Sequence, residues 1–348
     1  MPFDGVYQKG ASNFFSWSTS PESSVTGDIL ISRLEAIQEG LSIRVSSDLS
    51  GSLGGSETVG AQTQEAAFRC PFDQQCYVHI QRSPNATDVD LVEYSLDIFE
   101  VSPFIESLIS TQGLVRDFEL RSNLLYSVGP AGLTIADRNT LDILSQLTIP
   151  ASTGITFCGS FLCVSRMSGG GFSVLDTSSS TTYVAFAGDN SIKSASDITY
   201  SNNRIYLAQG TGGVGIYELD NSGTASYFGT VSLDGKAVSV AANKQVLAIA
   251  SSDGYIYIYD IFENPPAQNV VFEAQGKIKK IGFKSGQLWI LGKQSNWVEI
   301  YKQSSNTTFE FLGATSEDPG VHFNSKFLGS KMYSIVNGNL LRFSFELP

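Results

Sequence analysis

One short strand-like motif recurs along this chain and limits what the chain can fold into. Its clearest copy is residues 254–260, GYIYIYD, where tyrosine and isoleucine alternate between a turn glycine and an aspartate. A period of two in β-branched and aromatic residues predicts a β-strand. Both alternating sets are large and apolar, so we expect both faces of this strand to be covered.

The motif returns at a nearly constant interval. The aspartates that close it lie 40, 39, 44 and 40 residues apart: Asp97, Asp137, Asp176, Asp220 and Asp260. Each unit also holds an apolar first strand and a second strand, usually with an aromatic residue. The longest internal match, DIFEVSP at 97–103 against DIFENPP at 260–266, has an offset of 163, which is four such periods. A period of about 40 residues with about four strands predicts a β-propeller blade.

The number of units predicts an all-β, seven-bladed β-propeller over residues 65–348. The last unit stops at Pro348 directly after its third strand, so we expect its outer strand to come from elsewhere in the chain. Residues 41–49 (LSIRVSSDL) predict a strand outside any complete unit. Because an open sheet edge exposes unpaired backbone groups, we expect residues 1–64 to form an N-terminal tail whose strand at 41–49 closes the last blade.

The third strands also resemble those of a known group of proteins. GLTIAD at 132–137, GFSVLD at 171–176 and GYIYIYD at 254–260 are similar to the LVIVD-type repeats of seven-bladed propellers, and more loosely to the WD-repeat superfamily. The resemblance covers roughly residues 65–348. It implies an interaction platform more often than an enzyme, although fold alone does not choose between them.

Composition narrows the classes of partner. Charged residues make up 16% of the chain, which is too few for a helical bundle or a disordered region. The formal net charge is −12, so nucleic-acid backbones and anionic lipid surfaces would be repelled on average. No window approaches 18 consecutive apolar residues, so we expect no membrane insertion. Protein partners remain.

Catalytic motifs are scarce. The two histidines, His79 and His322, are far apart and lack metal-ligand spacing, and no nucleophile elbow or phosphate-binding loop is present. We therefore predict no cofactor, no metal and no catalytic residue. Acidic groups in expected loops leave one alternative, a propeller hydrolase or lactonase with a divalent metal at the channel mouth, as in the propeller lactonases that this layout resembles.

The candidate binding residues are acidic loop residues and two aromatic anchors. Phe262 follows a strand end, so packing against its own blade is the alternative to a partner contact. The innermost strands supply residues of mixed charge and size, which do not form an obvious carboxylate cage: Arg116, Asp117, Thr156, Asp197, Ser239, Lys280 and Asn324. The candidate binding residues are Asp88, Asp90, Asp189, Asp253, Phe262 and Trp297.

The four cysteines form two closely spaced pairs, Cys70 with Cys76 and Cys158 with Cys163. Each pair would join the first strand of a blade to its second, at the same hairpin of two blades, where cross-hairpin spacing can place the β-carbons within disulfide range. The alternative is small buried thiols in a reducing cytosol.

The compartment stays open at this stage. The segment after Met1 does not resemble a secretory signal, which favours the cytoplasm, whereas disulfides would indicate an extracellular protein. For function, the sequence predicts a non-enzymatic protein-interaction or structural scaffold within a larger assembly.

Overall fold

The structure is a computed structural model of the 348-residue chain. It describes residues 2–8, 13–18, 28–36, 41–47, 51–55, 63–70, 75–82, 91–100, 103–109, 111, 113–168, 171–177, 183–186, 194–263, 266–284, 286–293, 297–315, 323–328 and 330–345. Within these ranges regular structure is almost wholly β, and no helix is long and apolar enough to cross a membrane.

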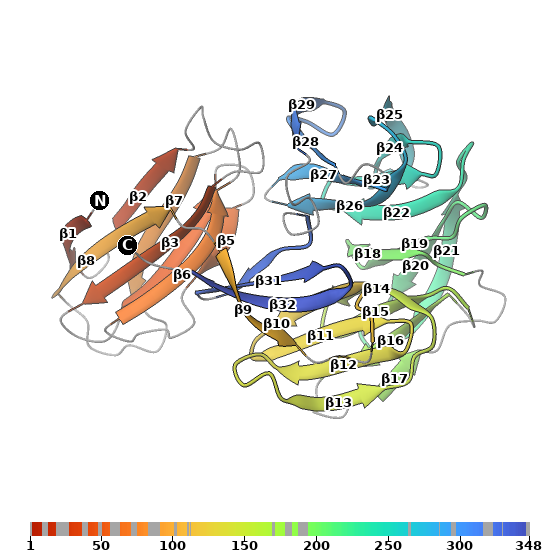
Figure 1. The fold of residues 1–348 in the computed structure, drawn as a ribbon. Helices are drawn as coiled ribbons and strands as arrows, with labels where there is room; N and C mark the ends of the chain where they lie inside the picture. The colour runs from red at the N-terminus through yellow and green to blue at the C-terminus, as the bar shows by residue number, and fades with distance from the viewer. Residues whose placement is uncertain are drawn as a thin grey trace.

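The larger part of the molecule is a ring of antiparallel four-stranded sheets (Figure 1). Five sheets are formed by strands consecutive in sequence. The first two are β10 (Asp117–Arg121), β11 (Leu124–Gly129), β12 (Gly132–Asp137) and β13 (Ile143–Leu147), then β14 (Ser152–Cys158), β15 (Phe161–Arg166), β16 (Phe172–Asp176) and β17 (Tyr183–Phe186). The third is β18 (Asp197–Ser201), β19 (Arg204–Ala208), β20 (Val214–Leu219) and β21 (Ala225–Val231).

The ring continues with two more such sheets and ends in a composite one. These two are β22 (Ala237–Ala242), β23 (Val246–Ser251), β24 (Tyr255–Asp260) and β25 (Ala267–Glu273), then β26 (Ile278–Lys284), β27 (Gln287–Gly292), β28 (Val298–Gln303) and β29 (Phe309–Thr315). The sixth sheet joins the end of the chain to an earlier strand, in the order β30 (Lys326–Leu328), β31 (Lys331–Val336), β32 (Asn339–Phe345) and β9 (Pro103–Ile109).

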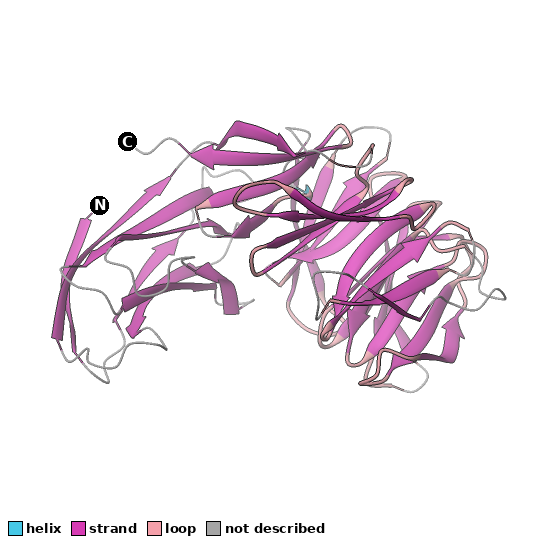
Figure 2. Cartoon of the chain, turned by 90° about the horizontal axis from the view of Figure 1, so that it is seen from below, coloured by secondary structure: helices cyan, strands magenta, loops and turns pink. Residues whose placement is uncertain are grey.

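Strands β1 to β8 form a pair of sheets beside the ring (Figure 2). One sheet has the order β1 (Pro2–Gln8), β8 (Leu91–Glu100), β3 (Asp28–Ala36) and β6 (Thr63–Cys70). The other has the order β2 (Asn13–Ser18), β7 (Gln75–Arg82), β4 (Leu41–Ser47) and β5 (Gly51–Gly55). Apolar residues of both sheets, including Leu30, Val45, Phe68 and Val78, share one core, so this part is a β-sandwich.

The β-propeller fold expected from the sequence is confirmed, with different strand assignments at its start. In the described residues, six sheets form the ring. The strands β6, β7 and β8, which were expected to form the first of seven blades, pair only within the sandwich. Strand signals of a sandwich and a blade are alike in sequence, since both are apolar strands joined by turns. The expected domain boundary at 64/65 falls inside β6, and strand pairing instead divides the chain between β8 and β9.

The strand that closes the ring is β9, not residues 41–49. β9 pairs with β32 from Ile109 opposite Leu340 to Pro103 opposite Phe345. Residues 41–47 form β4, which lies between β7 and β5 in the sandwich. The expectation that an earlier strand completes the last sheet therefore holds, but the strand comes from the segment directly before the ring.

Apolar side chains between neighbouring sheets hold the ring together. One cluster joins Tyr206 and Ile216 of the third sheet to Leu247 and Tyr257 of the fourth. Polar contacts from one sheet to the next also repeat around the ring: Thr153 Oγ1 of the second sheet donates to Ala195 O before the third, and Ser196 Oγ donates to Val238 O of the fourth, each at 2.9 Å and each across 42 residues. The period seen in the sequence is thus the number of residues between a position in one sheet and the equivalent position in the next.

Recurrent aspartates within the ring have a local role in the turns between third and fourth strands, whereas Asp97 lies inside β8 of the sandwich. Asp137 Oδ1 accepts hydrogen bonds from the backbone N–H of Asn139 and Thr140, at 2.8 and 2.9 Å. Asp220 Oδ1 accepts from Ser222 N and Thr224 N in the same way. The hydrogen bonds to Asp137, chiefly the one from Thr140 N, lower the pKa of its carboxyl group. An aspartate suits this position because its short carboxylate reaches the backbone of its own turn.

Candidate functional site: the central channel and the faces of the ring

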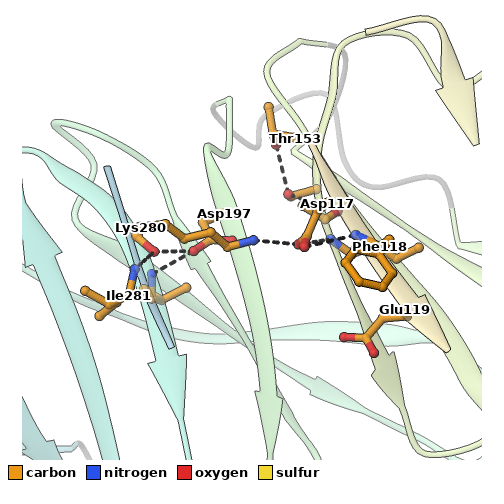
Figure 3. Close-up of polar contacts among 12 residues, drawn as sticks. Asp117, Phe118, Glu119, Thr153, Asp197, Lys280 and Ile281 are labelled. Carbon is orange, nitrogen blue, oxygen red and sulfur yellow. Dashed lines mark hydrogen bonds and ion pairs between the residues drawn. The ribbon is translucent and has the colours of Figure 1, made fainter. Parts of the chain in front are cut away.

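The innermost strands of all six sheets line one channel with a cavity volume of about 340 Å³. Residues near the beginning of these strands form its first polar layer. Lys280 Nζ of β26 lies 2.8 Å from Asp117 Oδ2 of β10, and the Lys280 side chain extends past Asp197 to reach it (Figure 3). The ion pair therefore connects the fifth sheet to the first.

Asp197 of β18 continues this layer. Its Oδ2 accepts hydrogen bonds from Ser239 Oγ and, at 3.2 Å, from Val240 N, and Ser239 Oγ accepts from Ile281 N at 3.0 Å. Burial raises the pKa of Asp197 despite the nearby Lys280 ammonium, and the Asp117 carboxylate raises it further. Burial alone would lower the pKa of Lys280, but Asp117 and Asp197 together raise it. Lys280 therefore stays charged between them.

A second layer lies deeper along the same strands. Lys326 Nζ of β30 is 2.7 Å from Glu119 Oε1 of β10, and it lies 5.5 Å from the centroid of the Phe118 ring. This ion pair joins the last sheet to the first. Two acid–base pairs thus cross the channel at successive depths.

Lys284, at the end of β26, has a different environment. Its Nζ donates to Ser325 O at 3.3 Å and lies 5.1 and 5.5 Å from the ring centroids of Trp289 and Phe323. Burial lowers the pKa of Lys284 well below its usual range, and the positive charges of Arg69, Lys326 and Lys280 lower it further. Arg69 belongs to β6, which lies against β30. The sandwich therefore contributes a cation that acts on Lys284.

The inner-strand residues expected from the sequence are largely those that meet here. Asp117, Asp197, Lys280, Thr156 and Asn324 line the channel. Ser239 reaches it through its bond to Asp197. Lys284, Glu119 and Lys326 were not singled out from the sequence. Each lies two or four residues from an expected position on the same strand. Because alternate residues of a strand share a face, this spacing could have indicated that they also face the channel.

The candidate binding residues are not gathered into one site. Asp88, Asp90 and Asp189 lie outside the described residues, so a channel-mouth metal site built from them stays a prediction. In the described part of the chain, no group of three or more His, Cys, Asp or Glu side chains is placed to hold a metal ion. Asp253 is exposed in the turn between β23 and β24, where it accepts a hydrogen bond from Ser251 Oγ.

The two aromatic candidates differ in exposure. Trp297 is only 7% exposed, and its indole is so close to Gly292 that any side chain at that position would overlap it. It is a core residue and offers no anchor to a partner. Phe262 is 69% exposed and follows the end of β24, opposite the end that carries Asp253. Phe262 and Asp253 therefore lie on opposite faces of the ring.

A surface pocket adjoins Phe262. It has a volume of about 570 Å³ and is lined by residues of two neighbouring sheets: Asn202, Asn203, Arg204, Glu218, Leu219, Ile261 and Phe262. Asn202 and Asn203 occupy the left-handed region, with φ of 51° and 59°, as suits a tight turn. The asparagine pair was the sequence signal for this turn, but nothing in the sequence placed it beside Phe262.

Both cysteine pairs are joined in the structure, Cys70 to Cys76 and Cys158 to Cys163, with Cα–Cα distances of 5.8 and 6.0 Å. The expected equivalence of the two pairs is wrong. Cys158 and Cys163 lie on paired strands of one sheet, whereas Cys70 of β6 and Cys76 of β7 connect the two sheets of the sandwich.

The redox state of these cysteines is testable by counting thiols. We expect protein purified from its native source, unfolded in denaturant without reductant, to show no reactive thiol, and reduction to release four. Four thiols before reduction would contradict the pairing and indicate a reducing compartment.

Comparisons with known proteins bear on the fold. No protein-family model and no curated protein matches this sequence. A crystal structure of the mitotic checkpoint complex matches with a TM-score of 0.50 and 12% identity, over 78% of this chain and 84% of that one. The β-propeller domain of Cps50 (Swd1) from Myceliophteria thermophila matches with a TM-score of 0.49 and 12% identity, over 70% and 88%. Such likeness concerns the fold alone, and together with the six sheets around one channel it identifies the fold of the chain as a β-propeller.

Proposed function

We propose that this chain is a non-enzymatic scaffold whose propeller holds a protein partner within a larger assembly. The observation that carries the proposal is Phe262, an aromatic side chain that is 69% exposed at the rim of the 570 Å³ pocket. Aromatic residues beside preformed pockets are the usual centres of binding energy in protein interfaces. A ring with fixed strands and variable turns positions such residues well.

The pocket is held in place by contacts that its residues make with one another and with residues next to the pocket. Asn202 Nδ2 donates to Lys244 O at 3.2 Å, and Asn203 Oδ1 accepts from Tyr200 OH at 3.0 Å. Arg204 pairs with Glu218 at 3.4 Å and stacks over the Phe228 ring, 4.0 Å from its centroid. A partner would therefore meet a surface that needs little further ordering, which favours affinity.

The exposure of Phe262 supports a partner contact over packing within its own blade, the alternative left open by the sequence. Its backbone N–H donates to Asp260 Oδ1 at 2.8 Å, so the turn is fixed while the ring extends to solvent. The opposed charges in the channel bond to one another, as in Lys280 with Asp117 and Lys326 with Glu119, which supports a structural role for those groups. The matched structure titled a mitotic checkpoint complex is itself an assembly, in keeping with this proposal.

The experiment compares Phe262→Asp with Tyr227→Asp. Both replace a strongly exposed aromatic residue, since Tyr227 is 64% exposed on the outer strand β21, but Tyr227 does not line the pocket. We expect tagged full-length chain to capture a stoichiometric protein from native extract. Phe262→Asp should weaken binding of that protein, once purified, by about 2 kcal/mol or roughly thirtyfold in Kd, as at a hot spot. The Tyr227→Asp variant should bind it like the unaltered chain.

Two results would count against the proposal. Recovery of the chain alone would mean that no protein partner binds it in the extract. Equal binding of the captured protein by both variants would move the contact away from Phe262.

A further inference from the structure

The turn between β28 and β29 carries a sequence motif that the partner proposal does not use. Asn306, Thr307 and Thr308 form the pattern Asn-x-Thr, in which x is any residue except proline and the asparagine can accept an N-linked glycan. In a chain rich in asparagine and threonine, such a motif also arises by chance. Its place in the fold and the state of the cysteines therefore decide whether it is a modification site.

The motif lies at the tip of a hairpin. The strands β28 and β29 pair as far as Gln303 and Phe309, so the residues between these two lie beyond the strand ladder. Thr307 and Thr308 are exposed, and Asn306 is half-buried. A glycan is bulky and has to remain in solvent, so an exposed turn of this kind suits it.

Contacts with the neighbouring sheet hold this turn in place. Asn306 Nδ2 donates to Asp260 Oδ2 at 3.2 Å, and Asn243 Nδ2 donates to Gln303 Oε1 at 2.6 Å. The amide nitrogen of an asparagine side chain carries two hydrogens. A sugar can replace one of them while the other keeps the bond to Asp260, so a glycan at Asn306 is compatible with the folded ring.

The cysteines give an independent indication of the compartment. All four are joined, Cys70 to Cys76 and Cys158 to Cys163, and no cysteine is free. Disulfides form and persist in secretory and extracellular compartments and are rare in the cytosol. Glycans are added to Asn-x-Thr motifs of secreted proteins. A chain that forms its disulfides on the secretory route is therefore also exposed to the glycosylating enzyme.

We propose that Asn306 carries an N-linked glycan. The donor is an oligosaccharide on a polyprenyl diphosphate, which a membrane-bound oligosaccharyltransferase uses. A bond forms between Asn306 Nδ2 and the anomeric carbon of the first sugar, the bond from that carbon to the diphosphate oxygen breaks, and Nδ2 loses one proton. The polyprenyl diphosphate leaves, and the step needs no oxidant or reductant.

The glycan would stand on the same face of the ring as Phe262. The Asp260 carboxylate joins the two positions, because it accepts from Asn306 Nδ2 through one oxygen and from Phe262 N through the other. The modification does not rest on the partner contact at Phe262, since it is read from the mass of a peptide and needs no partner.

The test uses full-length protein purified from its native source. Digestion with peptide-N-glycosidase F in heavy-oxygen water converts a glycosylated asparagine to an aspartate that carries the heavy isotope, and peptide mass spectrometry locates this label. We expect label at Asn306, whose peptide should carry the mass of a glycan before digestion. We expect none at Asn202 or Asn203, which are exposed but lie outside any such motif. An Asn306 peptide with neither glycan nor label overturns the proposal.

Two variants in the same turn separate the motif from the fold. Thr308→Ala removes the hydroxyl that the motif requires, whereas Thr307→Ala removes one that the motif does not require. The Thr308 and Thr307 hydroxyls lie 3.0 and 3.3 Å from Ser305 Oγ, so the two variants lose equivalent contacts. When both are expressed in the native organism, Thr307→Ala should keep the label at Asn306 and Thr308→Ala should lose it. Label that persists in Thr308→Ala, or that is lost from both variants, contradicts the assignment.

Discussion

The Ile109→Asp variant is expected to have an open ring and to be unfolded at ordinary temperatures, so that its melting curve shows no cooperative transition. Ile109 is 2% exposed on the closing strand β9, where it packs with Phe118 and Leu125 of the first sheet and Leu340 of the last. A carboxylate here would be buried among apolar side chains, at a cost of several kcal/mol, which is comparable to the total stability of a typical domain. Thermal melting followed by circular dichroism, with light scattering for aggregation, measures the effect.

The matched control is Ile105→Asp on the same strand. Ile105 is 61% exposed, so the same substitution should change the free energy of unfolding by no more than about 0.5 kcal/mol. Normal folding of both variants would show that β9 does not close the ring. Loss of folding by both would point to strand propensity rather than burial.

Lys280→Met is expected to lower the free energy of unfolding by about 3 kcal/mol. The methionine keeps most of the lysine volume, but Asp117 loses its 2.8 Å partner and the buried Asp197 loses its nearest cation. Removing one member of a buried ion pair typically costs roughly 3–5 kcal/mol, and the lower end applies because the Lys280 side chain is 24% exposed. Urea denaturation of full-length protein gives the value.

The double variant Lys280→Met/Asp117→Asn provides the control. Phe118 N and Ile155 N donate to different oxygens of Asp117, so asparagine keeps an acceptor for one of them, and it removes the unpaired charge. Part of the loss should therefore be recovered. Strictly additive losses would mean that the two side chains do not interact. A loss below about 0.5 kcal/mol in the single variant would show the pair to be solvated.

The propeller could be predicted because its signal is local and repeated. Alternating apolar residues mark strands such as β24. The aspartates Asp137, Asp220 and Asp260, at or directly after third-strand ends, accept hydrogen bonds from residues close in sequence. The match between residues 97–103 and 260–266 was informative too, because both segments lead into the outermost strand of a sheet, β9 and β25. What it could not show is that the strand before Pro103 belongs to another part of the protein.

Other features depend on pairings that no sequence pattern marks. The sandwich pairs β3 with both β6 and β8, and its apolar strands are indistinguishable by composition from those of a blade. The candidate site was predicted only as a set of inner positions. That Lys280 reaches Asp117, or that Arg69 of the sandwich acts on Lys284, depends on distances across a closed ring.

The junction between the two parts of the molecule has a mechanical consequence. β8 of the sandwich ends at Glu100 and β9 begins at Pro103, so two residues separate the sandwich from the strand that closes the ring. Pro103 is also the end of the β9–β32 ladder, opposite Phe345. A force that pulls on the sandwich would therefore act on the β9–β32 ladder before it acts on any other blade. Anything that pulls the sandwich away acts directly on the seam of the ring.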